Sequence, residues 1–255
     1  MIRIDFIGAP GCGKTTLVNK FVNSKLIDEA YKLSKARKLV LGKHFALKPD
    51  SSKSSRLSRW KKNLLKKVNP SFDKPKVNAF LASRMAQFDS LLTVILLNLS
   101  RNSTSKKTYL KFKRLEWFTR ILEDVLIVSE FAKDSVILCD ESLSSKLYQN
   151  DFGMVGKDLD HSLRNTLLPR GVVYVHCDRE VILDRLISRK KTTVAHSVHQ
   201  SNSMSKIVDD ELIQANMVVN ELLEQKVFVL KVDSTESINS NLEKIKQFIQ
   251  QMKRY

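Results

Sequence analysis

Residues 8–16 carry the most specific chemical pattern in the sequence. They read Gly-Ala-Pro-Gly-Cys-Gly-Lys-Thr-Thr, the spacing of a phosphate-binding loop, which is a glycine, four residues and then Gly-Lys-Thr. Glycines let backbone amide hydrogens converge on an anion, and the helix that follows points its positive dipole end at the same phosphates. A bare strand-to-helix turn has no use for a lysine followed by two hydroxyls. The pattern therefore predicts a nucleotide-phosphate site.

The side chains of this loop have separate expected roles. Lys14 would place its ammonium on the β- and γ-phosphates, Thr15 would be a hydroxyl ligand of Mg²⁺, and Thr16 would reach the α-phosphate. The predicted cofactor-binding residues of the loop are Gly8, Gly11, Cys12, Gly13, Lys14, Thr15 and Thr16.

A second candidate site follows the apolar run Ser135-Val-Ile-Leu-Cys. Asp140 and Glu141 come directly after it, and ligands bind at the carboxyl ends of strands in open α/β sheets. Asp140 is the expected acidic partner of Mg²⁺. Glu141 would hold an acceptor hydroxyl as general base or bind the metal through water. Helix capping is the structural alternative for both carboxylates.

Basic residues at a third strand end are candidates for binding transferring phosphates. Arg185 and Arg189 are four residues apart on a predicted helix and share a face. The chain then continues into the polar segment 189–206, which we interpret as a lid over the transferring phosphates. The alternative interpretation of these basic residues is an ordinary solvated helix end. After the last strand, Asp233 is expected to lie near the nucleotide base.

The elements that must position these residues are readable from hydrophobic periodicity. Buried strands are predicted at 2–7, 135–141, 171–177 and 226–232. Helices are predicted at 13–24, 78–99, 110–131, 181–189, 209–223 and 238–252. The order predicts an α/β fold of three layers, with a mainly parallel sheet between helices, in a single domain spanning residues 1–255.

Arginines on the two long central helices are candidates for acceptor binding. Arg84 lies among the apolar positions of the heavily buried helix expected at 78–99, where it would bind a phosphate or carboxylate, or else be ion-paired. Arg114 and Arg120 on the next helix are weaker candidates.

The chain is strongly basic, with a net charge of +17 and a pI near 9.8. Between Tyr31 and Lys76 there are fifteen Lys or Arg against two Asp, a net +13, so most of the excess lies in the segment 30–76. We expect this segment to be a basic insertion of short helices and loops that is either a solvated face or a collector of anions. Nucleic acid is a possible partner through it.

Three cysteines without close spacing argue against a disulfide framework and fit a cytoplasmic protein. The longest apolar stretch, near residues 91–99, is too short to span a membrane, so no transmembrane segment is expected. The oligomeric state is left open, and a dimer is compatible with the sequence.

Together these motifs resemble the P-loop kinases, specifically the group similar to nucleoside monophosphate and thymidylate kinases. The resemblance implies a five-stranded parallel sheet, ATP and Mg²⁺ as cofactors, Arg185 and Arg189 as lid arginines, and Arg84 as an acceptor-binding arginine. Residues 30–76 lie outside it. Thymidylate kinases usually have Asp-Arg-Tyr where this chain has Asp140-Glu141-Ser142, so the acceptor is left open.

The favoured function is therefore a phosphotransferase that uses ATP and Mg²⁺ on an anionic acceptor. A nucleotide-dependent ATPase or switch is one alternative, although no guanine-specifying Asn-Lys-x-Asp motif is present. A nucleic-acid 5′-end kinase or binder is the other.

Overall fold

Five parallel strands form the centre of the molecule in the order β2-β3-β1-β4-β5. The computed structural model describes residues 1–46, 72–102, 108–148, 159–188 and 201–254. The strands are β1 (Ile2–Ile7), β2 (Ala30–Lys32), β3 (Val136–Cys139), β4 (Gly171–His176) and β5 (Phe228–Asp233). The central strand β1 pairs with β3 and β4, so its carboxyl end lies between theirs.

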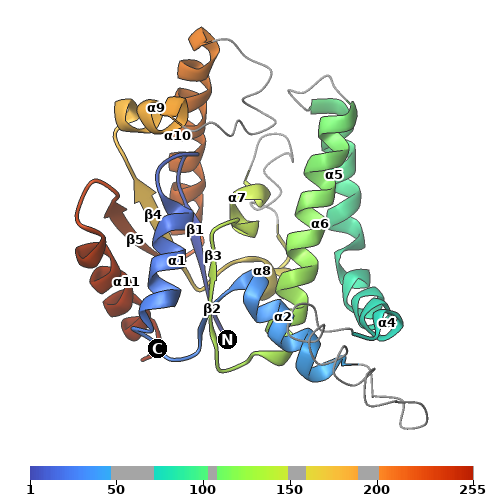
Figure 1. Cartoon of the computed structure of the whole chain (residues 1–255). Helices are drawn as coiled ribbons and strands as arrows, with labels where there is room; N and C mark the ends of the chain where they lie inside the picture. The colour runs from blue at the N-terminus through green and yellow to red at the C-terminus, as the bar shows by residue number, and fades with distance from the viewer. Residues whose placement is uncertain (47–71, 103–107, 149–158, 189–200, 255) are drawn as a thin grey trace, which may run out of the picture.

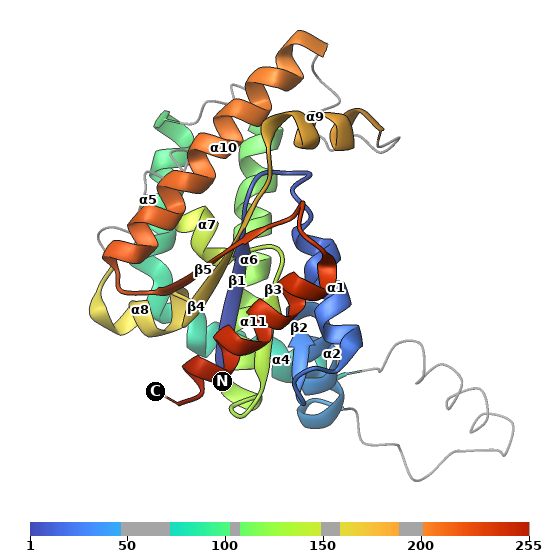
Figure 2. The same ribbon diagram turned by 90° about the vertical axis from the view of Figure 1, so that its left-hand side faces the viewer.

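Helices cover both faces of this sheet (Figures 1 and 2). One face packs against α1 (Lys14–Ser24) and α11 (Ile238–Met252). The other face carries α2 (Leu33–His44), α6 (Thr108–Phe131), α7 (Leu143–Leu147), α8 (His161–Leu167) and most of α10 (Ser201–Glu224). A further layer of α4 (Lys74–Met85), η1 (Ala86–Phe88) and α5 (Asp89–Asn102) packs on α6, and α9 (Arg179–Ser188) packs on α10. The predicted three-layer α/β fold class is confirmed.

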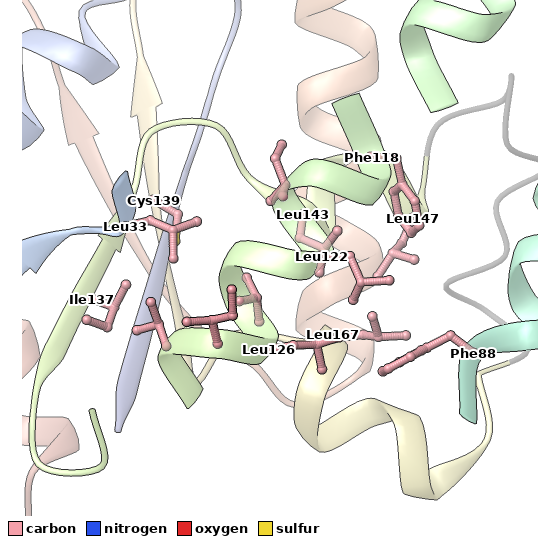
Figure 3. Packing of buried hydrophobic residues seen from close by; sticks show 14 of the residues in the cluster. Leu33, Phe88, Phe118, Leu122, Leu126, Ile137, Cys139, Leu143, Leu147 and Leu167 are labelled. Atoms are coloured by element: carbon pink, nitrogen blue, oxygen red, sulfur yellow. The ribbon is translucent and has the colours of Figure 1, made fainter. Parts of the chain in front are cut away.

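Successive side chains of each strand point to opposite faces of the sheet, so the core is divided into two clusters. In β3, Leu138 belongs to the cluster under α1 and α11, and its neighbour Cys139 belongs to the cluster under α2 and α6. Figure 3 shows the second cluster, which runs from Ile137 of the sheet through Leu122 of α6 to Phe88. Because every residue of β3 is buried, the strand needs the continuous apolar run seen in its sequence.

Four of the five strands agree with the sequence prediction, and the fifth lies where a basic insertion was expected. Residues 30–46 form β2 and α2, and β2 pairs in parallel with β3. The strand has only three half-buried residues, Ala-Tyr-Lys, so it lacks the apolar run that reveals the others. Within the segment 30–76, residues 47–71 lie outside the described part of the chain.

The single helix expected at 78–99 is divided in the structure into α4, the 3-10 turn η1 and α5, and it is less buried than its sequence suggests. By length and composition alone, the helical segment 74–101 is long and apolar enough to cross a membrane. Sequence patterns predicted no such segment. Phe88, Ile95 and Leu99 pack into the core, but Leu96 and Leu97 are 48% and 46% exposed. Core helices of soluble proteins pass the same test, so the finding is weak evidence for a membrane span.

A half-buried carboxyl group between α2 and α6 makes the stability of the fold depend on pH. Asp124 forms an ion pair with Arg37, with 2.6 Å between Oδ1 and Nε, and burial raises the pKa of Asp124 to about 6 in spite of the arginine. This pKa lies above the unfolded value of 3.8, so the folded state favours the protonated carboxyl group. The contribution of protonated Asp124 to the free energy of unfolding is therefore complete below pH 4 and is lost as the pH rises through 6. A shift of about 2 units corresponds to about 3 kcal/mol.

Asp124→Asn, which cannot ionise, is therefore expected to gain stability relative to the natural protein as the pH rises from 4 to 7. Urea unfolding at several pH values measures this difference. The exposed Asp134→Asn variant is the control for loss of a carboxylate elsewhere. A difference between Asp124→Asn and the natural protein that stays constant over this range would contradict the prediction.

Candidate active site

The predicted phosphate-binding loop joins β1 to α1 at the carboxyl edge of the sheet (Figure 1). Gly8 has a φ of +151° and lies so close to β4 that a Cβ there would collide with the Val175 carbonyl oxygen and come within 2.8 Å of Cys12 Sγ. Gly13 caps α1 with a φ of +102°, a left-handed conformation that favours glycine. The glycines are thus required by the backbone path of the loop.

The loop holds the Lys14 ammonium close to its own backbone. Lys14 Nζ donates hydrogen bonds to the carbonyl oxygens of Gly8 and Ala9 and lies 3.8 Å from Cys12 Sγ. Cys12 is fully buried, and burial raises the pKa of its thiol. Thr15 and Thr16 lie exposed in the first turn of α1, where hydroxyl groups are accessible to a ligand.

The two acidic residues after β3 point towards different partners. The register pairs Asp5 with Cys139, so Asp140 and Glu141 follow at the same edge as the loop. Asp140 Oδ2 lies 2.7 Å from Lys32 Nζ of β2. Glu141 Oε2 instead accepts a hydrogen bond from Trp117 Nε1 of α6 at 2.7 Å. The strand end therefore offers one carboxylate on the β2 side and one on the α6 side.

The predicted metal ligands have suitable chemistry for a hard cation. Mg²⁺ prefers oxygen ligands and is usually held by one or two protein groups together with substrate phosphates. The Thr15 hydroxyl and the Asp140 carboxylate supply such oxygens. Lys32 competes for Asp140, because its ammonium already neutralises that carboxylate at 2.7 Å. Among the described residues, no group of three or more His, Cys, Asp or Glu could hold a metal by itself.

Arg185 packs against the loop. Its NH1 group lies 3.0 Å from Ser234 Oγ, 3.4 Å from the Gly11 carbonyl oxygen and 3.5 Å from the Cys12 carbonyl oxygen. Through these contacts Arg185 links α9 to the loop and to the segment after β5. A role over the transferring phosphate would require it to leave them. Arg189 and most of the predicted lid, residues 189–200, lie outside the described residues, and 201–206 begin α10.

Asp233 is the last residue of β5 and precedes Ser234, which Arg185 contacts. Its Oδ1 accepts hydrogen bonds from the backbone nitrogen and the hydroxyl of Thr235, which lower the pKa of the carboxyl group. The next residue, Ser234, has its Cβ 3.8 Å from the position that a Cβ on Gly13 would take. The structure therefore brings the segment after β5 against the loop, and a position near the nucleotide base stays a prediction.

Arg84 has a different setting from the other candidates. Its NH2 group lies 2.6 Å from Glu130 Oε2, and its guanidinium lies over the Phe80 ring. The chain passes from the end of α6 into the amino end of β3, so Glu130 lies towards the edge of the sheet opposite the loop. The ion-paired interpretation of Arg84 fits this placement, and acceptor binding by Arg84 stays a prediction.

Two residues near the site were not predicted. Lys146 of α7 lies with Nζ 4.3 Å from the centroid of the Trp117 ring. Burial lowers the pKa of Lys146 to about 8, against the opposing charges of Glu211 and Glu141. Trp117 was interpreted only as a core residue, and the segment 142–168 has no clear periodicity. Apart from the basic type of Lys146, the sequence contains no signal for this convergence.

Known proteins offer limited comparison. No protein-family model and no curated protein matches the chain. Among solved structures, it is similar to a shikimate kinase from Bacteroides thetaiotaomicron, with 12% sequence identity, a TM-score of 0.45 and coverage of 98% of each chain. At this level the comparison carries no argument about function, which has to come from the residues of the site.

Proposed function

We propose that this protein is a phosphotransferase that uses ATP and Mg²⁺ to phosphorylate an anionic small molecule. The observation that carries the proposal is the division of the β3 end, where Asp140 and Glu141 separate at the edge that bears the phosphate-binding loop. Transfer to an acceptor hydroxyl needs one carboxylate beside the metal and a second that orients the hydroxyl and accepts its proton.

On the donor side, the loop amides and Lys14 would hold the nucleotide phosphates. Thr15 and Asp140 would hold Mg²⁺, which supplies charge neutralisation at the phosphoryl group being transferred. Ser234 and Asp233 border the loop on the side expected for the base.

On the acceptor side, Glu141 is fixed by two partners on α6. Trp117 donates to its Oε2 at 2.7 Å, and Arg120 NH2 lies 3.5 Å from the same oxygen. A carboxylate held in this way is suited to orienting a hydroxyl and accepting its proton. The other carboxylate oxygen has no partner among these contacts and would be the one that faces the hydroxyl.

An ADP-release screen tests the proposal. The full-length protein is mixed with ATP and Mg²⁺ and with nucleoside monophosphates, sugars and their phosphates, hydroxy acids, or short oligonucleotides carrying a 5′-hydroxyl group. We expect ADP release that depends on one anionic small molecule and stops when EDTA is added.

Two results would overturn it. ATP hydrolysis that no acceptor stimulates would favour an ATPase or switch. Stimulation only by oligonucleotides, falling steeply with added salt, would favour a nucleic-acid 5′-end kinase, because salt dependence reports phosphate-backbone contacts.

A further inference from the structure

We propose that the free end of the helix pair α5 and α6 is a docking surface for an anionic lipid membrane. This surface, the hairpin tip, has an apolar part and a basic part. The apolar part consists of Val94, Leu96, Leu97, Tyr109 and Phe112, and the basic part consists of Arg101, Lys111 and Lys113. Phosphoryl transfer does not need such a surface, so the inference goes beyond the proposed function.

The end of α5 and the start of α6 lie side by side, as neighbouring antiparallel helices (Figure 1). Lys111 Nζ of α6 donates a hydrogen bond to the Ser100 carbonyl oxygen of α5 at 3.2 Å. The last turn of α5 is therefore beside the first turns of α6. Since α6 leads into the amino end of β3, its own start lies towards the edge of the sheet that bears the phosphate-binding loop.

Exposed apolar side chains are concentrated on the hairpin tip. It carries five of the eleven exposed large hydrophobic residues in the described part of the chain. Tyr109 and Phe112 are the most exposed of the five, at 63% and 66%. On α5, Val94, Leu97 and Arg101 are three and four residues apart and share a face. Apolar side chains gathered in this way mark a site of protein or membrane interaction.

The other side of α5 determines how the hairpin tip could meet a membrane. Ile95 and Leu99 are buried in the cluster that also contains Phe118 of α6. These core contacts hold α5 on the protein and leave its outer face for a partner. The helical segment 74–101 is long enough to cross a bilayer, but this packing favours lying on the surface with the outer face at the lipid boundary.

The charge of the hairpin tip favours an anionic partner. The described residues between 94 and 115 include four basic residues, Arg101, Lys111, Lys113 and Arg114, and no acidic residue. Lys113 Nζ lies 5.9 Å from the centroid of the Tyr109 ring and forms an exposed ion pair with Glu116. An exposed pair of this kind contributes little and exchanges readily for a lipid phosphate. Aromatic rings beside lysines suit a membrane interface, where the rings enter the lipid and the ammonium groups stay with the headgroups.

A bilayer fits both parts of the hairpin tip better than the other anionic or apolar partners do. A second copy of the chain would bring two basic surfaces together, in a protein with a net charge of +17. Nucleic acid would attract the basic part, but its phosphate backbone offers no apolar environment for the aliphatic side chains Val94, Leu96 and Leu97. Acidic headgroups above acyl chains supply both environments.

Vesicle sedimentation with the full-length protein tests the surface. Vesicles of phosphatidylcholine alone are compared with vesicles of phosphatidylcholine and phosphatidylglycerol in equal parts, at an ionic strength of about 0.15 M. We expect binding to the anionic vesicles and much weaker binding to the neutral ones, because basic residues near an anionic surface add to the attraction. No binding to the anionic vesicles overturns the proposal.

Variants in the apolar part locate the binding. Leu97→Ser with Phe112→Ser should weaken it at least about 10-fold, because this apolar surface no longer enters the lipid. Leu39→Ser with Leu223→Ser is the matched control, with side chains that are 50% and 51% exposed on other helices, and it should bind normally. Circular dichroism checks folding, and Leu96→Ser with Leu97→Ser replaces the first pair if that pair is not folded.

Variants in the basic part separate a local effect from the charge of the whole chain. Arg101→Gln with Lys113→Gln should weaken binding about 5-fold for each charge removed. Lys20→Gln with Lys253→Gln changes the net charge equally at exposed positions elsewhere and should bind as the natural protein does. Equal losses in the two pairs, or binding that the apolar variants leave intact, would show adsorption by overall charge and overturn the docking surface.

A label at the hairpin tip reports insertion directly. The three natural cysteines are buried, so Phe112→Cys provides a reactive thiol for an environment-sensitive dye. We expect its fluorescence to rise with anionic vesicles, and the same dye on Leu39→Cys to stay unchanged. A response that is equal at both positions overturns the proposal. So does loss of a dimer, or of oligonucleotide binding, in Leu97→Ser with Phe112→Ser while vesicle binding is kept, since the surface would then serve a second copy or nucleic acid.

Discussion

Lys14→Ala is expected to lower the rate of phosphoryl transfer by at least about 10²- to 10³-fold, the effect of removing one preorganised charge from a developing phosphoryl transition state. No other lysine side chain in the described part of the chain donates to the loop carbonyls of Gly8 and Ala9. The measurement is acceptor-dependent ADP release at saturating ATP, together with ATP affinity by calorimetry.

The fold should survive this substitution. Lys14 donates hydrogen bonds to two half-buried carbonyl groups, and their loss should cost about 3 kcal/mol of unfolding free energy at most. Lys20→Ala, on the exposed face of the same helix, is the matched control and should keep normal turnover. Transfer at more than a tenth of the natural rate by a folded Lys14→Ala protein would contradict the donor half of the proposal.

The parts of the fold that the sequence predicted are those with strong hydrophobic periodicity. Strand β4 is predicted at 171–177 and observed at Gly171–His176, and helix α11 is predicted and observed at residues 238–252. Strand β2 was missed because an edge strand of three half-buried residues needs no apolar run. It is defined by its pairing with β3, which is a long-range contact and invisible in local sequence.

The candidate site also has one part that the sequence predicts and one part that it does not. The phosphate-binding loop is contiguous, so its spacing alone predicts where its glycines and Lys14 lie. Lys146, Trp117 and Glu141 come from three different elements, and only the packing of α6 against α7 brings them together. Arg84 shows a limit of periodicity, because helical spacing among apolar residues does not reveal which end of the sheet a side chain faces.

Replacing either member of the buried Arg3–Asp5 pair is expected to lower the unfolding free energy by about 3–5 kcal/mol, because the remaining charge is left buried without its partner. Arg3 and Asp5 are two residues apart on the same face of β1, exposed by only 4% and 0%, with 3.3 Å between Nε and Oδ1. Arg3 also donates to the carbonyl oxygens of Thr166 and Leu167. The pair thus ties the central strand to the end of α8.

Asp5 also anchors the start of α7, which carries Lys146. Its Oδ2 accepts hydrogen bonds from Ser142 Oγ at 2.9 Å and from Ser144 Oγ at 2.7 Å. The two hydroxyl groups lie 2.7 Å apart and can satisfy each other if the carboxylate is removed. The double variant Arg3→Met with Asp5→Leu should therefore be more stable than the sum of the single losses predicts, because no charge is left buried.

Urea unfolding of Arg3→Met, Asp5→Leu and the double variant measures this coupling. The exposed pair Lys244–Glu236, whose side chains are both 41% exposed, is the matched control, and its single alanine variants should each cost less than about 1 kcal/mol. Strictly additive losses at Arg3 and Asp5 would show that the two charges act independently. The contribution of Asp5 would then lie in its hydrogen bonds to Ser142 and Ser144, and the stability of α7 would depend on those hydroxyl groups alone.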